Sequence, residues 1–567
     1  MDIRSNTEES LLLIRNRANR RKSLVIDNDY DESPEEDLEE TKEIRLEWDA
    51  EEAPEIKELE HPEELNLDVH SVFHEINKTN PKRLNRRRTE INDPKYVSRF
   101  ADVRFRGKST TIFDAQSFKD SEVFGIYVLF WLGTAFLMMN NMVHYYFENS
   151  ESIWNWPIVV ILRTDILKVG ATDLAMYLTT YFAYLIQYAV YKNWITWHRT
   201  GWILQTIYCA AHLQFWLVFA SKLYMDFTWI AKVFLVLHNL VFLMKMHSYS
   251  FYNGYLWKVY RELQFSRKCL KRTTNGDATL TSPFDEEQTK TMLEESIAFC
   301  KFELEYQSMA NPVSTEGTEV KKQELVKFPD NITLQNFFEY SMFPTVVYTL
   351  NYPRTETIRW GYVREKVIGI FGIIFLMVSV AQKWMYPLVI RCIEVRSMPI
   401  QERFVAYLFI LLDMIPPFLM EYLFTFFLIW DAILNSIAEL SRFADRDFYG
   451  PWWSCTDWSE FSRLWNIPVH KFLLRHVYHS SISAFNLNKI QAALVTFMIS
   501  SIVHELVMYV IFGTLRGYLL LLQMSQIPLI MIGRTPFMRD KKVLGNVICW
   551  FGYISGPSMV CTLYLVY

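Results

Sequence analysis

One stretch near the C-terminal end of the chain holds residues that could move a proton inside a membrane. Between Ile490 and Phe512 the only charged or imidazole side chains are His504 and Glu505. They lie mid-way along an apolar run, where ionisable groups are costly and usually functional. Adjacent helical residues point about 100° apart, so only one of the two can face a given cavity. Taken alone, His504 fits catalysis or a structural hydrogen bond. The structural role is expected for His144, His212 and His238.

A second apolar run carries two carboxylates. Asp413 and Glu421 lie on either side of Pro416 and Pro417, a pair that predicts a kink. Both carboxylates would be expensive facing lipid, so they must face protein or a watery cavity. A substrate-path acid and a polar pair that holds helices together are both compatible with this pattern.

These residues need a framework, and the composition indicates a helical membrane domain. The chain of 567 residues is 51% hydrophobic and 16% aromatic. A helix needs about 20 apolar residues to cross the hydrocarbon core. Nine runs qualify as spans: 123–143, 174–191, 201–221, 227–244, 367–390, 404–430, 490–512, 517–533 and 543–567. The predicted fold class is therefore an all-α polytopic membrane protein.

The first part of the chain differs from the rest. Residues 1–118 carry an acidic run at 35–40 and a basic cluster at 82–88, and are expected to form a largely disordered cytosolic tail. Residues 119–567 are then the membrane domain. Lys and Arg collect at 104–108, 258–272 and 539–542, which places these loops in the cytosol. With nine spans, the N-terminus is cytosolic and the C-terminus lumenal. Seven scattered cysteines without a C-x-x-C pair predict neither a disulfide framework nor a metal site.

Five blocks in consistent order give the chain a specific resemblance. They are M-K-M-H-S-Y (244–249), F-P-T-V-V-Y-T-L-N-Y-P-R-T (343–355), F-A-D-R-D-F-Y-G-P-W-W-S (443–454), R-L-W-N-I-P-V-H-K-F (463–472) and S-I-V-H-E (501–505). Together they resemble the sterol O-acyltransferases of the membrane-bound O-acyltransferase superfamily, in particular the fungal branch. The family pattern F-Y-x-D-W-W-N differs at two positions, where this chain has Pro451 and Ser454.

The resemblance implies a fold, a reaction and a set of site residues. The fold would be about nine helices around a catalytic chamber in the endoplasmic reticulum membrane, in a homodimer or higher homo-oligomer. The reaction would join a fatty acyl group from acyl-CoA to a sterol hydroxyl, with His504 and Asn466 as catalytic residues. The residues implied in acyl-CoA binding are Phe448, Tyr449, Trp452, Trp453, Arg463, Trp465, His470 and Ser500.

The residue types suit this chemistry. Making an ester from a thioester requires a base for the hydroxyl proton, and a buried neutral imidazole such as His504 can accept it. The amide of Asn466 can donate a hydrogen bond to the carbonyl oxygen as charge develops. No G-x-S-x-G elbow is present, so we expect direct attack, with Cys455 as the nearest covalent alternative. Lys471 and Arg475 are either phosphate partners of the CoA or charges of a cytosolic loop.

Three other functions remain open at this point. Relatives in the same superfamily acylate diacylglycerol; a polytopic transporter could use a His/Glu relay; and an inactive membrane scaffold would tolerate loss of His504. We expect no cofactor beyond acyl-CoA as co-substrate, no metal and no nucleic-acid partner.

Overall fold

The structure is a computed structural model of the chain. It describes residues 98, 100, 103, 105, 107, 109–149, 152–220, 225–274, 286–309, 325–485, 487–539 and 541–567. The acidic run and the basic cluster of the predicted tail lie outside these residues, so their predicted disorder stays a prediction. By contacts the chain divides into two compact units, one comprising 1–99 and 258–303 and the other 100–257 and 304–567.

The described residues form helices, with no strand beyond one isolated bridge, which confirms the predicted all-α class. The earlier helices are α4 (Gln116–Lys119), α5 (Phe124–Asn149), η2 (Ile153–Asn155), α6 (Pro157–Arg163), α7 (Ile166–Thr179), α8 (Tyr181–Tyr191), η3 (Trp197–Gly201), α9 (Trp202–Ala220), α10 (Trp229–Thr274), α11 (Glu286–Met309) and α12 (Leu334–Met342). The middle ones are α13 (Trp360–Val380), η4 (Ala381–Met385), α14 (Tyr386–Val395), α15 (Ile400–Phe426), η5 (Phe427–Ile433) and α16 (Leu434–Leu440). The last are η6 (Trp452–Ser454), α17 (Trp458–Leu464), α18 (Ile467–Phe472), η7 (Leu473–Tyr478), α19 (His479–Phe485), α20 (Lys489–Phe512), α21 (Tyr518–Met524), α22 (Gln526–Gly533), α23 (Pro536–Arg539) and α24 (Lys542–Val566).

Seven helices in the described part of the chain are long and apolar enough to cross a membrane. They correspond to all the predicted spans except the second and the eighth. The second is divided at Thr180 into α7 and α8, and the eighth at Ser525 into α21 and α22. The count of nine spans therefore stays a prediction. α15 continues through Pro416 and Pro417, so a kink there also stays a prediction.

In the described part of the unit made of 1–99 and 258–303, the C-terminal end of α10 pairs with most of α11. Ser296 on α11 donates to Glu262 on α10 at 2.7 Å, and Ser266 donates to Ser296 at 3.1 Å. Ser98 donates to Glu303 at 2.9 Å. All five of these side chains are buried, so this pairing is held by a line of hydrogen bonds in addition to apolar contacts.

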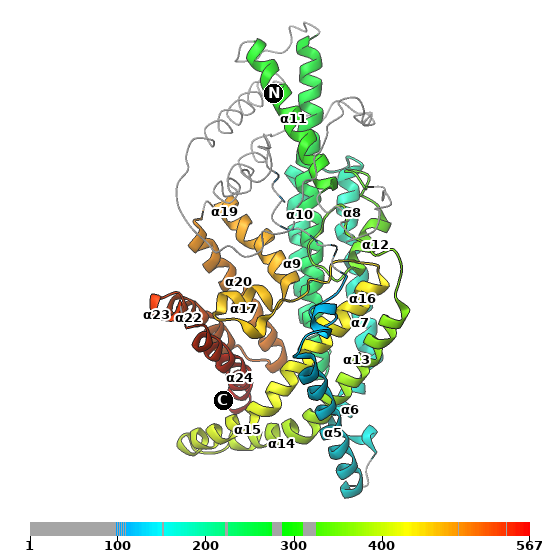
Figure 1. Cartoon of the computed structure of the whole chain (residues 1–567). Coiled ribbons are helices and arrows are strands. Elements are labelled where there is room, and N and C mark those ends of the chain that lie inside the picture. The colour runs from blue at the N-terminus through cyan, green and yellow to red at the C-terminus, as the bar shows by residue number, and fades with distance from the viewer. Residues whose placement is uncertain are drawn as a thin grey trace. The chain divides into compact units, whose positions relative to one another are not determined.

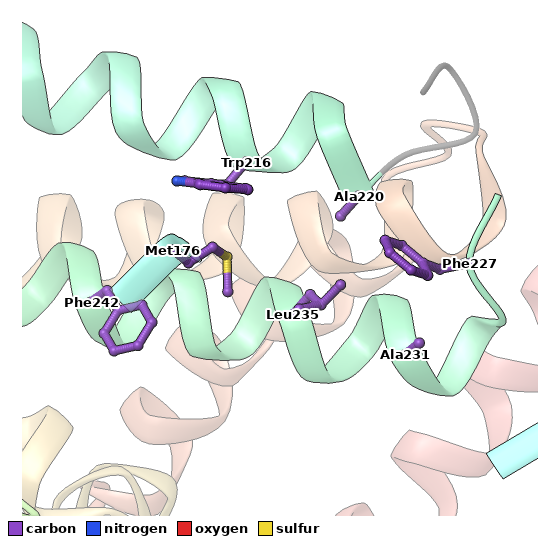
Figure 2. Packing of buried hydrophobic residues seen from close by; sticks show 7 residues of the cluster. All are labelled: Met176, Trp216, Ala220, Phe227, Ala231, Leu235 and Phe242. Carbon is purple, nitrogen blue, oxygen red and sulfur yellow. The ribbon is translucent and has the colours of Figure 1, made fainter. Parts of the chain in front are cut away.

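In the larger unit, α7, α9 and α10 share an apolar cluster (Figure 2) formed by Met176, Trp216, Ala220, Phe227, Ala231, Leu235 and Phe242. Two histidines beside it make the hydrogen bonds expected of structural residues. His212 lies 3.1 Å from the Thr179 hydroxyl, and His238 lies 2.5 Å from Asp173. These contacts anchor the helices of this part of the bundle to one another.

The helices that carry the candidate site lie in the C-terminal part of the larger unit. α24 runs beside α15, and α20 packs against both α21 and the π-helical segment η7 (Figure 1). Between α16 and α19, residues 441–478 form loops and short helices. The aromatic blocks at 443–454 and 463–472 therefore lie on short elements between long helices.

Candidate active site

α20 presents His504 because both of its ends are fixed by local sequence. At its start, Asn488 accepts from the Gln491 backbone at 2.9 Å and the Gln491 side chain accepts from the Asn488 backbone at 3.1 Å, which is a capping box. At its end, Gly513 adopts a left-handed φ of 71° and its N–H bonds Tyr509 O at 2.8 Å. The two caps fix the residues at which α20 begins and ends, and His504 lies within the helix between them.

The imidazole of His504 is oriented by its own helix. Nδ1 lies 2.7 Å from the carbonyl oxygen of Ser500, one turn earlier. A carbonyl can only accept, so in the neutral imidazole this contact puts the proton on Nδ1 and the lone pair on Nε2. The expectation of a buried imidazole is wrong for this structure, because His504 is exposed on α20. Nε2 is thus the nitrogen available to take a proton. Ser500 contributes to this arrangement through its backbone.

Glu505 points in a different direction from His504, as expected for adjacent residues about 100° apart on a helix. Its carboxylate is buried and accepts from Gly517 N at 2.6 Å, Leu520 N at 3.2 Å and the Tyr564 hydroxyl at 2.5 Å. These bonds join α20 to the start of α21 and to α24. Glu505 therefore holds helices together, and its three donors leave it no evident role as a relay partner of His504.

Residues 448–450 of the aromatic motif are hydrogen-bonded to residues 464–467, the segment that carries Asn466. Gly450 N donates to Leu464 O at 2.8 Å, and Ile467 N donates to Phe448 O at 3.1 Å. The two bonds bracket the dipeptide formed by Trp465 and Asn466. A Cβ on Gly450 would lie 2.6 Å from a Leu464 methyl carbon, so glycine lets the two segments meet without moving the Leu464 side chain. We call residues 448–450 with 464–467 the clamp.

Asn466 begins α18. Its side-chain oxygen accepts from Val469 N at 3.2 Å, as an N-cap residue does. That bond fixes which end of the amide is the oxygen, so Nδ2 is left as a donor. Among the described residues, no hydrogen bond joins Asn466 to His504. The link between them is indirect, because α18 continues into η7, which packs against α20.

Around the clamp is an aromatic cluster centred on Trp452, which is buried. Trp465 packs edge-on against Trp452 at 4.7 Å between ring centroids and stacks on Tyr422 at 4.7 Å. The Tyr449 ring lies 4.8 Å from Phe426, which also contacts Trp452. The carbonyl of Trp453 accepts from Asn546 and Trp550 on α24. The structure thus brings Tyr449, Trp452 and Trp465 together, and the cluster is a packed core beside the site.

The two earlier blocks of the sequence meet each other. Lys245 donates from Nζ to the carbonyls of Tyr340, Ser341 and Phe343 at 2.6 to 3.1 Å. Ser248 accepts from Tyr348 N at 2.8 Å and lies 2.8 Å from Nε2 of His476 on η7. The M-K-M-H-S-Y block is thereby joined to η7, which packs against α20, the helix that carries His504.

The N-Y-P-R-T block pairs with the aromatic motif through its backbone. Ala444 N donates to Pro353 O and Thr355 N donates to Arg442 O, both at 2.9 Å. Tyr352 lies 5.8 Å from Phe443 between ring centroids. The blocks at 343–355 and 443–454, although far apart in the sequence, are thus in direct contact in the fold.

The basic side chains near the motif differ in availability. Arg463 is exposed and uses only Nε, on Ser459 O at 3.1 Å, among the described residues. Lys471 pairs with the buried Asp445 at 3.2 Å, and half-buried His470 lies one turn after Asn466. Arg475 is 3% exposed and donates to the carbonyls of Tyr348 and Phe100. Of the three cations considered for the CoA phosphates, Arg463 alone has a free guanidinium end, and Arg475 is structural.

The structure also describes the surroundings of three other groups considered in the sequence. Asp413 is exposed and lies 3.4 Å from Arg391 on α14, which fits a polar pair between helices. Cys455 is buried, and burial raises the pKa of its thiol to about 12. Such a thiol stays protonated at neutral pH, which disfavours an acyl-enzyme on Cys455. Glu421 lies on α15, and its Oε1 is buried with no hydrogen-bond partner among the described residues.

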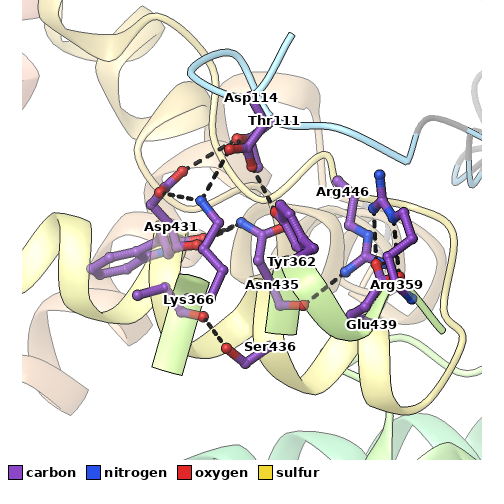
Figure 3. Close-up of polar contacts among 12 residues, drawn as sticks. Thr111, Asp114, Arg359, Tyr362, Lys366, Asp431, Asn435, Ser436, Glu439 and Arg446 are labelled. Atoms are coloured by element: carbon purple, nitrogen blue, oxygen red, sulfur yellow. Dashed lines mark hydrogen bonds and ion pairs between the residues drawn. The ribbon is translucent and has the colours of Figure 1, made fainter. Parts of the chain in front are cut away.

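The sequence did not reveal a buried polar network (Figure 3), to which the Tyr449 hydroxyl of the clamp is hydrogen-bonded. Asp431 of η5 pairs with Lys366 of α13 at 2.8 Å, and Lys366 also pairs with Asp114 at 3.1 Å. Arg359 and Arg446 both bond Glu439. The only signal in the sequence is that Lys366 and Asp431 directly flank apolar runs, a position that ordinarily indicates interfacial charge.

Comparisons with known proteins identify chains that are similar to this one. The model of "MBOAT, membrane-bound O-acyltransferase family" matches residues 126–566. The chain is 53% identical to a sterol O-acyltransferase 2 of Candida albicans over 100% of both proteins. It is 46% identical to the sterol O-acyltransferase 2 of Saccharomyces cerevisiae, over 78% of this chain and 66% of that protein. A diacylglycerol O-acyltransferase 1 of Dictyostelium discoideum is 31% identical over 42% of this chain and 37% of that protein.

Proposed function

Because the chain belongs to the membrane-bound O-acyltransferase family, we propose that it transfers a fatty acyl group from acyl-CoA to the 3-hydroxyl of a sterol. The observation that carries this proposal is the similarity to a sterol O-acyltransferase along the entire chain at 53% identity. The similarity to a diacylglycerol O-acyltransferase covers less than half of the chain at 31% identity. A transporter or a scaffold would have no function for the clamp that holds Trp465 and Asn466.

In this reaction His504 is the general base. The sterol hydroxyl gives its proton to Nε2, the nitrogen left unprotonated by the contact of Nδ1 with Ser500 O. The hydroxyl oxygen attacks the thioester carbonyl carbon, and the C–S bond breaks as the tetrahedral intermediate collapses. The proton on Nε2 then passes to the departing CoA sulfur, so His504 ends as it began. The high pKa of the Cys455 thiol supports direct transfer.

Asn466 stabilises the negative charge that develops on the carbonyl oxygen. Its Nδ2 is the donor, since Oδ1 is taken by the N-cap bond of α18. A neutral donor suits a site in the membrane, because it adds no charge for the apolar surroundings to penalise. The clamp sets the backbone on both sides of this residue, which supports its use as a fixed donor.

Incubating membranes that contain the protein with labelled oleoyl-CoA and either a sterol or diacylglycerol tests the proposal. We expect labelled sterol ester and little labelled triacylglycerol. Membranes with the His504→Ala protein, matched for inserted protein, are the control. Preferential labelling of triacylglycerol would replace the proposed acceptor, and no acylation of either acceptor would remove the proposed activity.

Arg463→Ala is expected to weaken acyl-CoA binding more than turnover. The exposed guanidinium has free N–H groups that match the phosphates of CoA. We expect KM for oleoyl-CoA to rise about tenfold, as one charge-assisted contact typically requires, with kcat within about threefold. Arg442→Ala is the matched control, because Arg442 is also exposed and, among the described residues, also uses only Nε, on the carbonyl of Thr355. Arg442 lies just after α16 and not beside Trp465 and Asn466. We expect its replacement to leave KM for oleoyl-CoA unchanged. A shift in sterol dependence with unchanged acyl-CoA dependence would contradict the assignment.

The cellular setting follows from the proposed reaction. We propose a multi-pass protein of the endoplasmic reticulum membrane with a cytosolic N-terminus and a lumenal C-terminus, in which acyl-CoA enters from the cytosol. The distribution of Lys and Arg between loops supports this orientation. A homodimer or higher homo-oligomer is proposed from the family resemblance.

A further inference from the structure

Asp431 is the hub of the buried network in Figure 3, although the proposed mechanism does not use it. Asp431 lies on η5 and is 8% exposed. Lys366 Nζ donates to Oδ2 at 2.8 Å. Oδ1 accepts from the Tyr449 hydroxyl at 2.9 Å and lies 3.2 Å from the Thr111 hydroxyl. Three segments distant in sequence therefore meet at one carboxylate.

The network extends from Asp431 in both directions. Asp114 accepts from Lys366 at 3.1 Å and from the Tyr362 hydroxyl at 2.6 Å. On the other side, Asn435 donates to Asp431 O at 2.8 Å, and Arg446 donates to Asn435 O at 2.9 Å. The ionised groups are thus paired with opposite charges and bonded to neutral ones, which is the condition for a stable buried charge cluster.

Tyr449 connects this network to the clamp. The residues on either side of it, Phe448 and Gly450, are the ones whose backbone groups bond Ile467 N and Leu464 O. Tyr449 is itself 3% exposed. A tyrosine whose hydroxyl is tied to a fixed carboxylate cannot shift without moving both neighbours. Two backbone hydrogen bonds and the Tyr449 hydroxyl therefore link Trp465 and Asn466 to Asp431.

We propose that Asp431, held by Lys366 and Asp114, is a positioning residue that sets Asn466 for catalysis through the Tyr449 hydroxyl and the clamp. This inference rests on the proposed role of Asn466 as donor to the carbonyl oxygen. Its physical basis is that a donor displaced by about 1 Å can lose about 10²-fold in rate. The network supplies the stiffness that a short loop would otherwise lack.

The test is a double-mutant cycle between Tyr449→Phe and Asn466→Ala in the full-length protein in membranes. Removing the hydroxyl leaves the ring packing and leaves Asp431 with Lys366. We expect Tyr449→Phe to lower kcat about tenfold at unchanged KM for oleoyl-CoA. In the Asn466→Ala background the same change should lower kcat less than twofold, because a displaced donor matters only if it is present.

Tyr553→Phe is the matched control. Its hydroxyl is buried in the same aromatic cluster and has no hydrogen-bond partner among the described residues. Removing it is expected to leave kcat and KM unchanged. If Tyr449→Phe fails to accumulate, Thr111→Val serves as the second variant, since it removes the other hydroxyl beside Asp431 Oδ1. We expect about a threefold loss in kcat with the same dependence on Asn466.

Several results would overturn the inference while leaving sterol acylation intact. These are an equal tenfold loss in both backgrounds, a rise in KM for oleoyl-CoA at unchanged kcat, and full activity of Tyr449→Phe. The second of these would make Tyr449 an acyl-CoA contact. Absence of sterol ester with the unmodified protein is a separate result, which would overturn the proposed function itself.

Discussion

Replacing His504 with Ala is expected to abolish sterol ester formation while leaving the protein inserted in the membrane. Loss of a positioned general base costs about 10² to 10⁴ in rate. No other residue at helical spacing is a substitute, because Glu505 is occupied by three donors and Ser501 donates to Phe497 O. The measurement is ester synthesis at saturating oleoyl-CoA per unit of inserted protein.

Glu505→Gln provides the contrast to His504→Ala. A Gln amide would turn an N–H₂ group toward one of the donors from Gly517, Leu520 or Tyr564. An unsatisfied buried polar group costs about 1 to 3 kcal/mol. We expect less folded protein but near-normal turnover per folded molecule. Near-normal turnover by His504→Ala would exclude His504 as the base.

Replacing Asn466 with Ala is expected to lower kcat about 10² to 10³-fold, as loss of one oxyanion donor typically does. The substitution also removes the N-cap of α18. Asn466→Ser separates the two roles, because serine caps a helix well but has no amide donor. We expect Asn466→Ser to recover thermal stability lost in Asn466→Ala while turnover stays low. Recovery of turnover by serine would show that Asn466 acts only as a cap.

The expectations about the site came from two kinds of signal, and the catalytic roles stay predictions. His504 is indicated by its isolation in an apolar run, whereas Asn466 is indicated by the resemblance of its W-N dipeptide to the family. Most of the long apolar helices also follow from run length alone. The exceptions are the runs interrupted at Thr180 and Ser525, where apolar composition continues but the helix does not. Composition over a window does not register a single break of this kind.

The remaining features depend on partners far away in the sequence. The donors to Glu505 come from 12, 15 and 59 residues later. Arg475 was considered for phosphate binding, yet its acceptors Tyr348 and Phe100 are 127 and 375 residues away. A charge pattern cannot distinguish a solvated arginine from one that lies in a tertiary contact. The same holds for Lys366 and Asp431.

The wide spacing of the buried network has a consequence for biogenesis. Asp114 and Lys366 are 252 residues apart, and Lys366 and Asp431 are 65 apart. During synthesis Asp114 and Lys366 are therefore made before Asp431, and the ion pair of Lys366 with Asp431 can form only once η5 has been made. Asn466 and His504 follow Asp431 in the chain, so the buried charges can be paired before either proposed catalytic residue has been synthesised.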